Sequence, residues 1–177
     1  MKARSARIIL IIVFLVILSP FLLLYALWVI DFVQLRFIST PEQVLTRYYT
    51  EKDLAEDQLI DSLILGGSKM VPILEKEILK KDIVRRRYAI LALGNIGDKN
   101  SIPVLEQILQ DRDEKEYYRG DALVAIALID LSTAQKIAPQ YLSETGSLSK
   151  RARDTLSPTP FFWAKRPYWD AFFRVHD

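Results

Sequence analysis

The sequence predicts an all-α protein in which one N-terminal transmembrane helix is followed by a short α-solenoid of about three helical hairpins. Two observations support this prediction. Residues 8–30 contain no charged side chain, and from residue 56 onward apolar side chains recur every three to four positions in short segments. The first pattern is typical of a membrane span and the second of amphipathic helices. No segment alternates strictly between apolar and polar residues, so we expect no strand.

These patterns divide the chain into five parts. We expect a basic cytoplasmic tail over 1–7, the transmembrane helix over 8–30 and a connector with a short helix over 31–55. The repeat domain then covers 56–145, and 146–177 is a C-terminal tail rich in proline and aromatic residues.

The apolar run from Ile8 to Ile30 is long enough to cross a bilayer. A helix of its 23 residues reaches roughly 34 Å, against a hydrocarbon core of roughly 30 Å. Tyr25 and Trp28 lie near its far end, where aromatic rings prefer the headgroup level, and Pro20 predicts a kink. The alternative is a cleaved signal peptide, whose apolar region would be about 7–15 residues long and end in small residues. Because this run is longer and its end is bulky, we interpret it as an uncleaved anchor in the lipid bilayer.

The distribution of charge indicates the orientation of the anchor. Lys2, Arg4 and Arg7 precede the run, which favours a cytoplasmic N-terminus and a repeat domain on the translocated side, periplasmic or extracellular. All 22 acidic residues lie at Asp31 or later, together with 21 of the 24 basic residues. The folded part is therefore nearly neutral, which argues against nucleic acid as a partner.

Catalytic motifs are not found. The chain has no cysteine and one histidine, His176, next to its last residue, so no serine has a histidine base in a plausible place. No Gly-rich phosphate loop is present. The acidic motifs Glu75-x-Glu77 and Asp111-x-Asp113-Glu114 could bind a divalent cation, but the second lacks the glycine and distal glutamate of a calcium loop. We expect no catalytic, cofactor or metal site, and no enzyme activity.

The helices expected after the anchor begin with 41–50, because Thr40-Pro41-Glu42 combines an N-cap residue with a proline at the first helical position. Six amphipathic segments follow. Their apolar residues fall over 59–64, 70–81, 83–96, 101–110, 117–131 and 133–142.

Two of these segments repeat. Val71-Pro72-Ile73-Leu74-Glu75 recurs as Ile102-Pro103-Val104-Leu105-Glu106, an offset of 31 residues. Arg86-x-x-Ala89-x-x-Ala92 recurs as Arg119-x-x-Ala122-x-x-Ala125, an offset of 33. Periods of this length with two helices per unit indicate an α-solenoid, in which small residues let neighbouring helices approach closely.

The central unit resembles a known repeat family. The stretch from Val84 to Asp98, which includes Ala89-Ile90-Leu91-Ala92-Leu93-Gly94, is followed by Ile102-Pro103-Val104-Leu105 and Leu109-x-Asp111. It resembles a HEAT repeat of the short, phycobilisome-lyase-like type. The resemblance extends over roughly 56–143, with degenerate units at either end, as in capping repeats. It implies that Arg86 and Arg119 form ion pairs with aspartates of adjacent repeats, Asp111 being one candidate.

A basic cluster crosses one helix–helix turn. It consists of Lys80, Lys81, Arg85, Arg86 and Arg87. One interpretation is a solvated surface combined with the arginines of the repeat, and the other is a contact for lipid phosphates or an acidic partner.

The tail carries seven aromatic residues within thirteen positions. Rings at this density are costly to leave in water, because each buries about 150–250 Å² when it packs. The tail could cap the last repeat, bind a partner or lie in the membrane interface. The candidate partner-binding residues are Phe161, Phe162, Trp163, Tyr168, Trp169, Phe172 and Phe173, together with Arg85 and Arg87 of the basic cluster.

We therefore expect a membrane-anchored protein-interaction module. Its partner would be another membrane or envelope protein, to which it would be an accessory or assembly subunit. A regulatory or inhibitor protein that blocks one target, such as an immunity protein, is the second hypothesis, and an enzyme such as a lyase is the third. The sequence does not indicate an oligomeric state.

Overall fold

The computed structural model describes residues 2–52, 59–158 and 164, of which 2–13 and 15 are described by their backbone only. Every regular element in these residues is helical. The chain divides into two compact units, residues 1–38 and residues 39–177, which are treated separately below.

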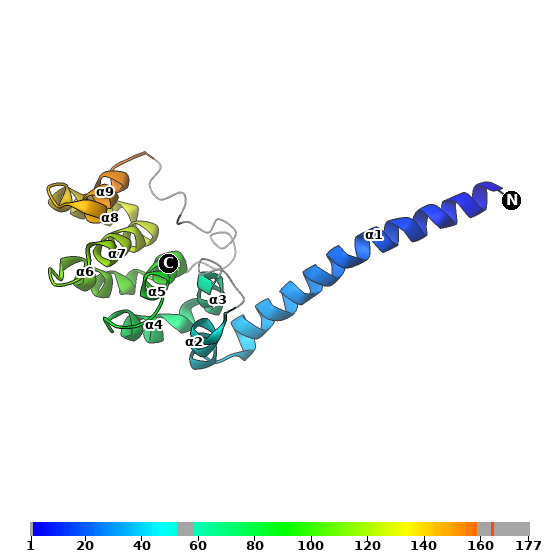
Figure 1. Cartoon of the computed structure of the whole chain (residues 1–177), viewed down its shortest axis with the longest axis horizontal. Helices are drawn as coiled ribbons and strands as arrows, with labels where there is room; N and C mark the ends of the chain where they lie inside the picture. The colour runs from blue at the N-terminus through cyan, green and yellow to red at the C-terminus, as the bar shows by residue number, and fades with distance from the viewer. Residues whose placement is uncertain (1, 53–58, 159–163, 165–177) are drawn as a thin grey trace. The chain divides into compact units, whose positions relative to one another are not determined.

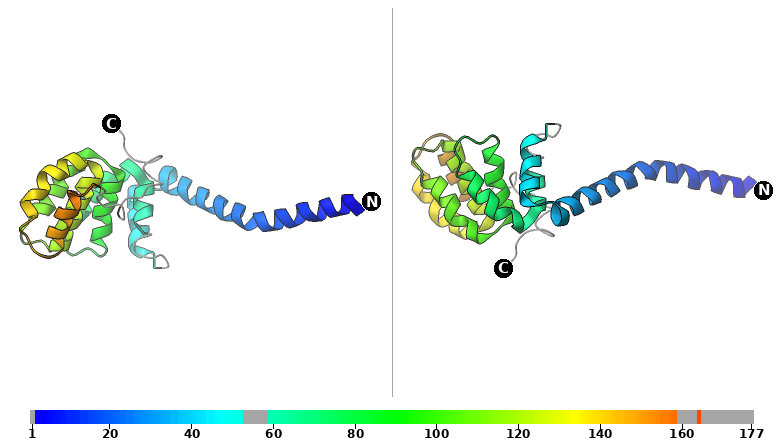
Figure 2. Two further views of the ribbon diagram at one scale, coloured as in Figure 1. Left: turned by 90° about the horizontal axis from the view of Figure 1, so that it is seen from above. Right: turned by 90° about the horizontal axis from the view of Figure 1, so that it is seen from below.

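The first unit is one long helix. Helix α1 (Lys2–Val33) continues into a short π-helical segment, η1 (Gln34–Ile38). Its ribbon bends in the middle part (Figure 2), and Pro20 is the proline within it, which removes one backbone hydrogen bond. Within the described side chains, Val16–Ile38 is long and apolar enough to cross a membrane, and none of its apolar window is buried in the structure. This helix is a candidate membrane anchor.

The second unit contains eight α-helices and three short 3₁₀ segments within the described residues. Figure 1 shows the helices following one another in chain order along this unit. The elements are α2 (Pro41–Thr50), α3 (Leu59–Gly66), η2 (Gly67–Met70), α4 (Val71–Ile78), α5 (Arg86–Ile96), η3 (Lys99–Ser101), α6 (Ile102–Gln110), α7 (Glu116–Ile129), α8 (Leu131–Ile137), η4 (Ala138–Tyr141) and α9 (Gly146–Thr155).

Local sequence signals fix several of these helix ends. Thr40 and Gln43 form a capping box at the start of α2, where each side chain bonds to the backbone N–H of the other residue. Pro103 lies in the first turn of α6, where its missing N–H has no cost. Gly97 ends α5 in the left-handed conformation with φ of 85°. Asp130 caps α8 by accepting hydrogen bonds from the backbone N–H groups of Ser132 and Thr133.

The helices form two rows. Helices α3, α5, α7 and α9 pack on one another in succession and make the stacked row. Helices α2, α4, α6 and α8 lie against the stacked row and make the covering row. Small residues set the spacing of the stacked row: a Cβ on Gly94 of α5 would come within 2.7 Å of the Ala125 Cα of α7. The core is apolar and lies between the rows, with Leu63, Leu93 and Leu105 among its fully buried side chains.

The packed hairpins differ in phase from the sequence units. Helix α4 packs on α5, and α6 packs on α7, so each hairpin has a covering helix first and a stacked helix second. The sequence units at 84–111 and 116–143 instead pair each stacked helix with the covering helix that follows it. Both descriptions give the same solenoid, but in the structure α2 packs on α3 as a first hairpin, and α8 packs mainly on α7 and less on α9.

The boundaries of the repeat unit are therefore wider than the 56–145 that the sequence predicts. Helix α2, which the sequence places in a connector over 31–55, packs on α3 and belongs to the compact unit that begins at Ser39. Helix α9 lies in the stretch that the sequence treats as tail. It is mostly polar, but it buries Leu148, Ala152 and Thr155 on one side, at the spacing of a helix.

Candidate interaction surface

Arg86 is a fully buried cation at the start of α5. Its side chain is 2% exposed. The Nε group donates to the backbone oxygen of Ile78 at 2.6 Å, at the end of α4, and Nη1 donates to Glu114 Oε2 at 2.5 Å. The guanidinium also lies 4.9 Å from the centre of the Tyr118 ring. Arg86 therefore joins the end of one covering helix to the loop of the next repeat.

Arg119 repeats this arrangement one unit later. Its Nε donates to the Leu109 oxygen at 2.9 Å, near the end of α6, and its Nη2 lies 3.4 Å from Glu144 Oε1. The structure thus contains a ladder of arginines, as the resemblance implies, but its partners are Glu114 and Glu144. Asp111 was the wrong candidate.

Asp111 is engaged elsewhere for a local reason. It follows α6 directly, and its carboxylate accepts a hydrogen bond from the backbone N–H of Asp113. Its other oxygen lies 2.7 Å from Lys81 Nζ. The hydrogen bond with Lys81 holds the pKa of Asp111 below its usual range. A glutamate three residues further along has the longer side chain needed to reach Arg86.

Arg85 stabilises the end of α2. Its guanidinium donates to the backbone oxygens of Tyr48 at 2.7 Å and Glu51 at 3.1 Å, and the Tyr48 hydroxyl donates to the Arg85 oxygen at 2.6 Å. These bonds satisfy carbonyls at the C-terminus of a helix, where no intrahelical donor remains. Arg85 adopts a left-handed backbone with φ of 63°, unusual for a residue with a side chain.

Arg87 lies over a buried carboxylate of the stacked row. Its Nε is 3.3 Å from Asp121 Oδ2, and Asp121 of α7 is 2% exposed. Burial raises the pKa of Asp121 to about 6, although the charges of Arg87 and Arg151 act in the opposite direction. Asp121 therefore links α5, α7 and α9 electrostatically.

All five cations of the basic cluster therefore have partners within the domain. Lys80 pairs with Glu77, and the other four cations have the partners described above. This supports the interpretation of the cluster as a solvated surface combined with repeat arginines. Arg85 and Arg87 stay predictions as partner-binding residues, but within the domain Arg85 already donates hydrogen bonds and Arg87 already forms an ion pair.

The acidic motifs are also engaged. Glu75 accepts a hydrogen bond from Ser101 at 2.8 Å, and Glu77 accepts one from Tyr49 at 3.1 Å. Burial and the nearby Glu77 raise the pKa of Tyr49. Among the described residues, no group of three or more carboxylate or imidazole side chains is arranged to hold a metal ion. His176 lies outside these residues.

Apolar side chains are left exposed in the loops that join covering helices to stacked helices, and in the first turn of α7. We name this surface the apolar loop edge. It consists of Leu79, Val84, Tyr117 and Leu142, which are 42%, 71%, 43% and 40% exposed.

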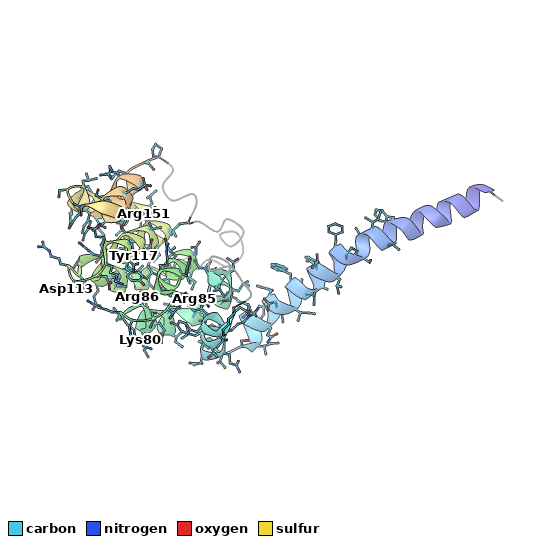
Figure 3. The ribbon with its side chains drawn as sticks, in the orientation of Figure 1. Lys80, Arg85, Arg86, Asp113, Tyr117 and Arg151 are labelled. Atoms are coloured by element: carbon cyan, nitrogen blue, oxygen red, sulfur yellow. The ribbon has the colours of Figure 1, made fainter. Side chains whose placement is uncertain are left out.

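The three loops of this edge are tied to one another. Lys81 of the first loop pairs with Asp111 of the second, and Thr145 of the third donates to Glu116 at 2.7 Å. Figure 3 labels Lys80 in the first of these loops, Asp113 in the second and Tyr117 at the start of α7. The edge is therefore continuous over three repeats. Sequence reasoning missed it, since isolated apolar residues in polar loops have no periodic signal.

The C-terminal tail returns to the stacked row at the one residue of its aromatic part that the structure describes. Ala164 is 7% exposed, and its backbone oxygen accepts a hydrogen bond at 3.2 Å from Asn95 Nδ2 of α5. Ala164 thus contacts the central repeat. The candidate residues Phe161, Phe162, Trp163, Tyr168, Trp169, Phe172 and Phe173 lie outside the described residues.

Comparison with known proteins gives one match. Residues 85–111 match the model of the PBS lyase HEAT-like repeat, which covers α5, η3, α6 and the residues at either end. No curated protein and no solved structure matches the chain at a significant level.

Proposed function

Because residues 85–111 are a PBS lyase HEAT-like repeat and adjacent helices continue the same stacking, we propose that the chain is a membrane-anchored protein-interaction module. It acts as an accessory or assembly subunit of a complex in a membrane or envelope. Stacked repeats present extended surfaces for binding a partner, and the apolar core between the two rows of helices stabilises this domain. The proposal includes no catalytic step.

The apolar loop edge is the observation that carries this proposal. Val84 is 71% exposed and lies in the loop between buried Ile78 of α4 and buried Arg86 of α5. Charged residues close by are neutralised within the domain, so the edge offers apolar contact with a polar rim. Protein interfaces have this composition, with aromatic residues such as Tyr117 enriched in their centres.

The N-terminal helix supplies the anchor in this proposal. Lys2, Arg4 and Arg7 favour a cytoplasmic N-terminus, so the repeats lie on the translocated side. The partner in this proposal is another membrane or envelope protein.

Site-specific photo-crosslinking in intact membranes tests the proposal. A photoreactive amino acid is placed at Val84 or Tyr117, with Gln107 on the exposed side of α6 as the matched control. We expect one discrete crosslinked species from the first two positions, lost when Leu79 and Leu142 are changed to serine. Equal labelling from Gln107, or a species that survives those changes, would exclude the apolar loop edge as the docking surface.

A further inference from the structure

The aromatic residues of α1 all lie on one side of the helix. They are Phe14, Phe21, Tyr25, Trp28 and Phe32. At 3.6 residues per turn they fall within roughly 60° of the helix circumference. Successive members are separated by 7, 4, 3 and 4 residues, which is the spacing of the a and d positions of a heptad repeat. We name this face the aromatic seam.

From Tyr25 onward the rings of the aromatic seam form a continuous series of contacts. The ring centres of Tyr25 and Trp28 are 6.2 Å apart, and those of Trp28 and Phe32 are 5.9 Å apart, with the rings stacked in both pairs. The Phe32 ring then lies edge to face with Phe37 at 6.0 Å. Phe37 belongs to η1, whose π-helical backbone relates residues five apart, and Phe32 and Phe37 have this separation. The π-helical segment therefore extends the seam by one ring.

The aromatic seam is uncovered and uncharged. Phe14 at its start is 62% exposed, and Phe37 at its end is 72% exposed. Asp31, the acidic residue of this helix, is turned by roughly 100° around the axis from Phe32. Two copies of the seam can therefore approach each other without repulsion between like charges.

The preference of aromatic rings for the membrane interface explains only part of the seam. Trp and Tyr favour the headgroup layer, which is about 5–8 Å deep on each side of the hydrocarbon core. From Phe14 to Phe32 the seam rises roughly 27 Å along the helix axis. It thus covers most of the depth of a hydrocarbon core of about 30 Å, and it does so on one face only. Lipid tails surround a helix on all sides, whereas a second helix packed alongside contacts one face over its whole length.

We propose that the aromatic seam is a dimerisation surface, at which two copies of this chain pair through their α1 helices, parallel and in register. Heptad spacing produces left-handed helix pairs in membranes as it does in water. Because both copies insert in the same direction, identical rings meet at the same depth. If half of each ring is covered, five rings from each copy bury about 750–1,250 Å². That area is close to the roughly 1,000 Å² of a specific interface. The inference rests on α1 as the membrane anchor of the proposed function, and it is independent of the apolar loop edge.

Disulfide scanning of the full chain in intact membranes tests this pairing, because the chain contains no cysteine. Single cysteines replace seam residues in the variants Phe14→Cys, Phe21→Cys and Trp28→Cys. The matched controls lie two residues further along, on the opposite side of the helix, and are Val16→Cys, Leu23→Cys and Ile30→Cys. The members of each pair differ in depth by only about 3 Å. A disulfide forms only when the two Cα atoms come within about 7 Å. After mild oxidation we therefore expect at least about fivefold more disulfide-linked dimer from the seam than from the controls.

Removal of rings gives a second measurement. In the Phe21→Cys variant, Trp28→Leu and Phe32→Leu together remove two rings and keep the helix apolar. Since each aromatic pair contributes about 0.5–1.5 kcal/mol, the initial rate of crosslinking should fall about fivefold or more. Leu23→Ala and Ile30→Ala, on the opposite side of the helix, should leave this rate unchanged. Equal yields from both sides of the helix, or a rate that does not depend on the rings, would overturn the proposal.

A photoreactive amino acid at Phe21 identifies the molecule that covers the seam. We expect an adduct of twice the mass of the chain. An adduct with a different protein, or adducts with lipid alone, would overturn the pairing of two copies. Resistance of the chain to alkaline carbonate extraction is measured in parallel. A chain that is extracted from the membrane would refute the anchor of the proposed function as well, whereas an inserted chain without a seam-specific dimer would refute this inference alone.

Discussion

The Arg86 guanidinium and the Glu114 carboxylate form an ion pair at 2.5 Å in which both side chains are almost completely buried, 2% and 5% exposed. Its counterpart one repeat later, Arg119 with Glu144, is longer at 3.4 Å, and Glu144 is 39% exposed. The two pairs occupy equivalent places in the ladder but differ in burial. They therefore form a natural comparison of how burial affects an ion pair.

Replacing Glu114 and Glu144 by alanine should lower the free energy of unfolding by different amounts. Glu114→Ala leaves a buried guanidinium without its carboxylate and should cost about 3 kcal/mol or more of unfolding free energy. Glu144→Ala removes a partly solvated partner and should cost below about 1 kcal/mol. Urea unfolding of the full chain in mild detergent, followed by far-UV circular dichroism, measures both. Equal losses would contradict the burial argument.

The contact between Gly94 and Ala125 should not tolerate a methyl group. A Cβ at Gly94 would lie 2.7 Å from the Ala125 Cα, which is backbone and cannot move away alone. Gly94→Ala should therefore lower stability by roughly 1–3 kcal/mol despite the better helix propensity of alanine.

Gly66→Ala is the matched control for this substitution. Its Cβ would meet only the flexible side chain of Met70, which can rotate away. The loss of stability should be clearly smaller than for Gly94→Ala. If both variants unfold at the same urea concentration, the close approach of α5 and α7 is not the limiting contact.

The left-handed backbone of Arg85 should make the stability of Arg85→Gly differ from that of Arg85→Ala. Arg85→Ala and Arg85→Gly both remove the bonds from the guanidinium to the Tyr48 and Glu51 carbonyls. Only glycine also relieves the backbone, whose φ is 63°. Arg85→Gly should thus be more stable than Arg85→Ala by about 1 kcal/mol in the same urea experiment. The reverse order would show that φ at this residue is not positive in solution.

Asp121 should make stability depend on pH. Its folded pKa of about 6 lies above its ordinary value of 3.8, so the folded state binds the proton more tightly than the unfolded state. Its contribution to stability is fully present below pH 3.8 and is lost as pH rises through 6.

Asp121→Asn should abolish this dependence. Between pH 5 and pH 7.5 the wild type should lose about 1.4 kcal/mol of stability relative to the variant, which is roughly half of the full effect of a pKa shift of about two units. Melting temperatures of both proteins across this range measure the difference. Parallel curves would mean that Asp121 is ionised in the fold throughout.

The orientation of the anchor can be tested with a reporter after Asp177. A fluorescent protein that folds only in the cytoplasm should stay dark in this position, and alkaline phosphatase, which needs an oxidising compartment, should be active. The opposite pair of results would place the repeats in the cytoplasm and remove the basis for an envelope partner.

The helical solenoid was predictable because its signals are periodic. Apolar stripes, the proline at the start of α6 and Gly97 at the end of α5 are visible in the sequence and appear in the structure as expected. Helix α2 was also predicted with its observed bounds, from the cap at Thr40. Its membership of the repeat unit was not, since it depends on packing against α3 and on bonds with Arg85 that span 37 residues.

The elements that were missed are those without a periodic signal. Helix α9 is mostly polar and buries only a narrow side, so its sequence resembles a solvated tail. Which carboxylate pairs with each repeat arginine depends on the length of side chains in irregular loops. For this reason Glu114, and not Asp111, pairs with Arg86. The bond from Asn95 to Ala164 joins two residues for which no pattern exists.

The order in which α2 to α9 pack has a consequence for biosynthesis. Each helix packs on helices no more than two places away in the chain, so a polypeptide growing from its N-terminus can pack each helix soon after the next one or two are complete. Little apolar surface then waits for distant segments to be translated. The bond that spans 69 residues is the exception, because Ala164 is made only after the solenoid is complete. The hydrogen bond from Asn95 to the Ala164 oxygen is therefore the last of these contacts to form.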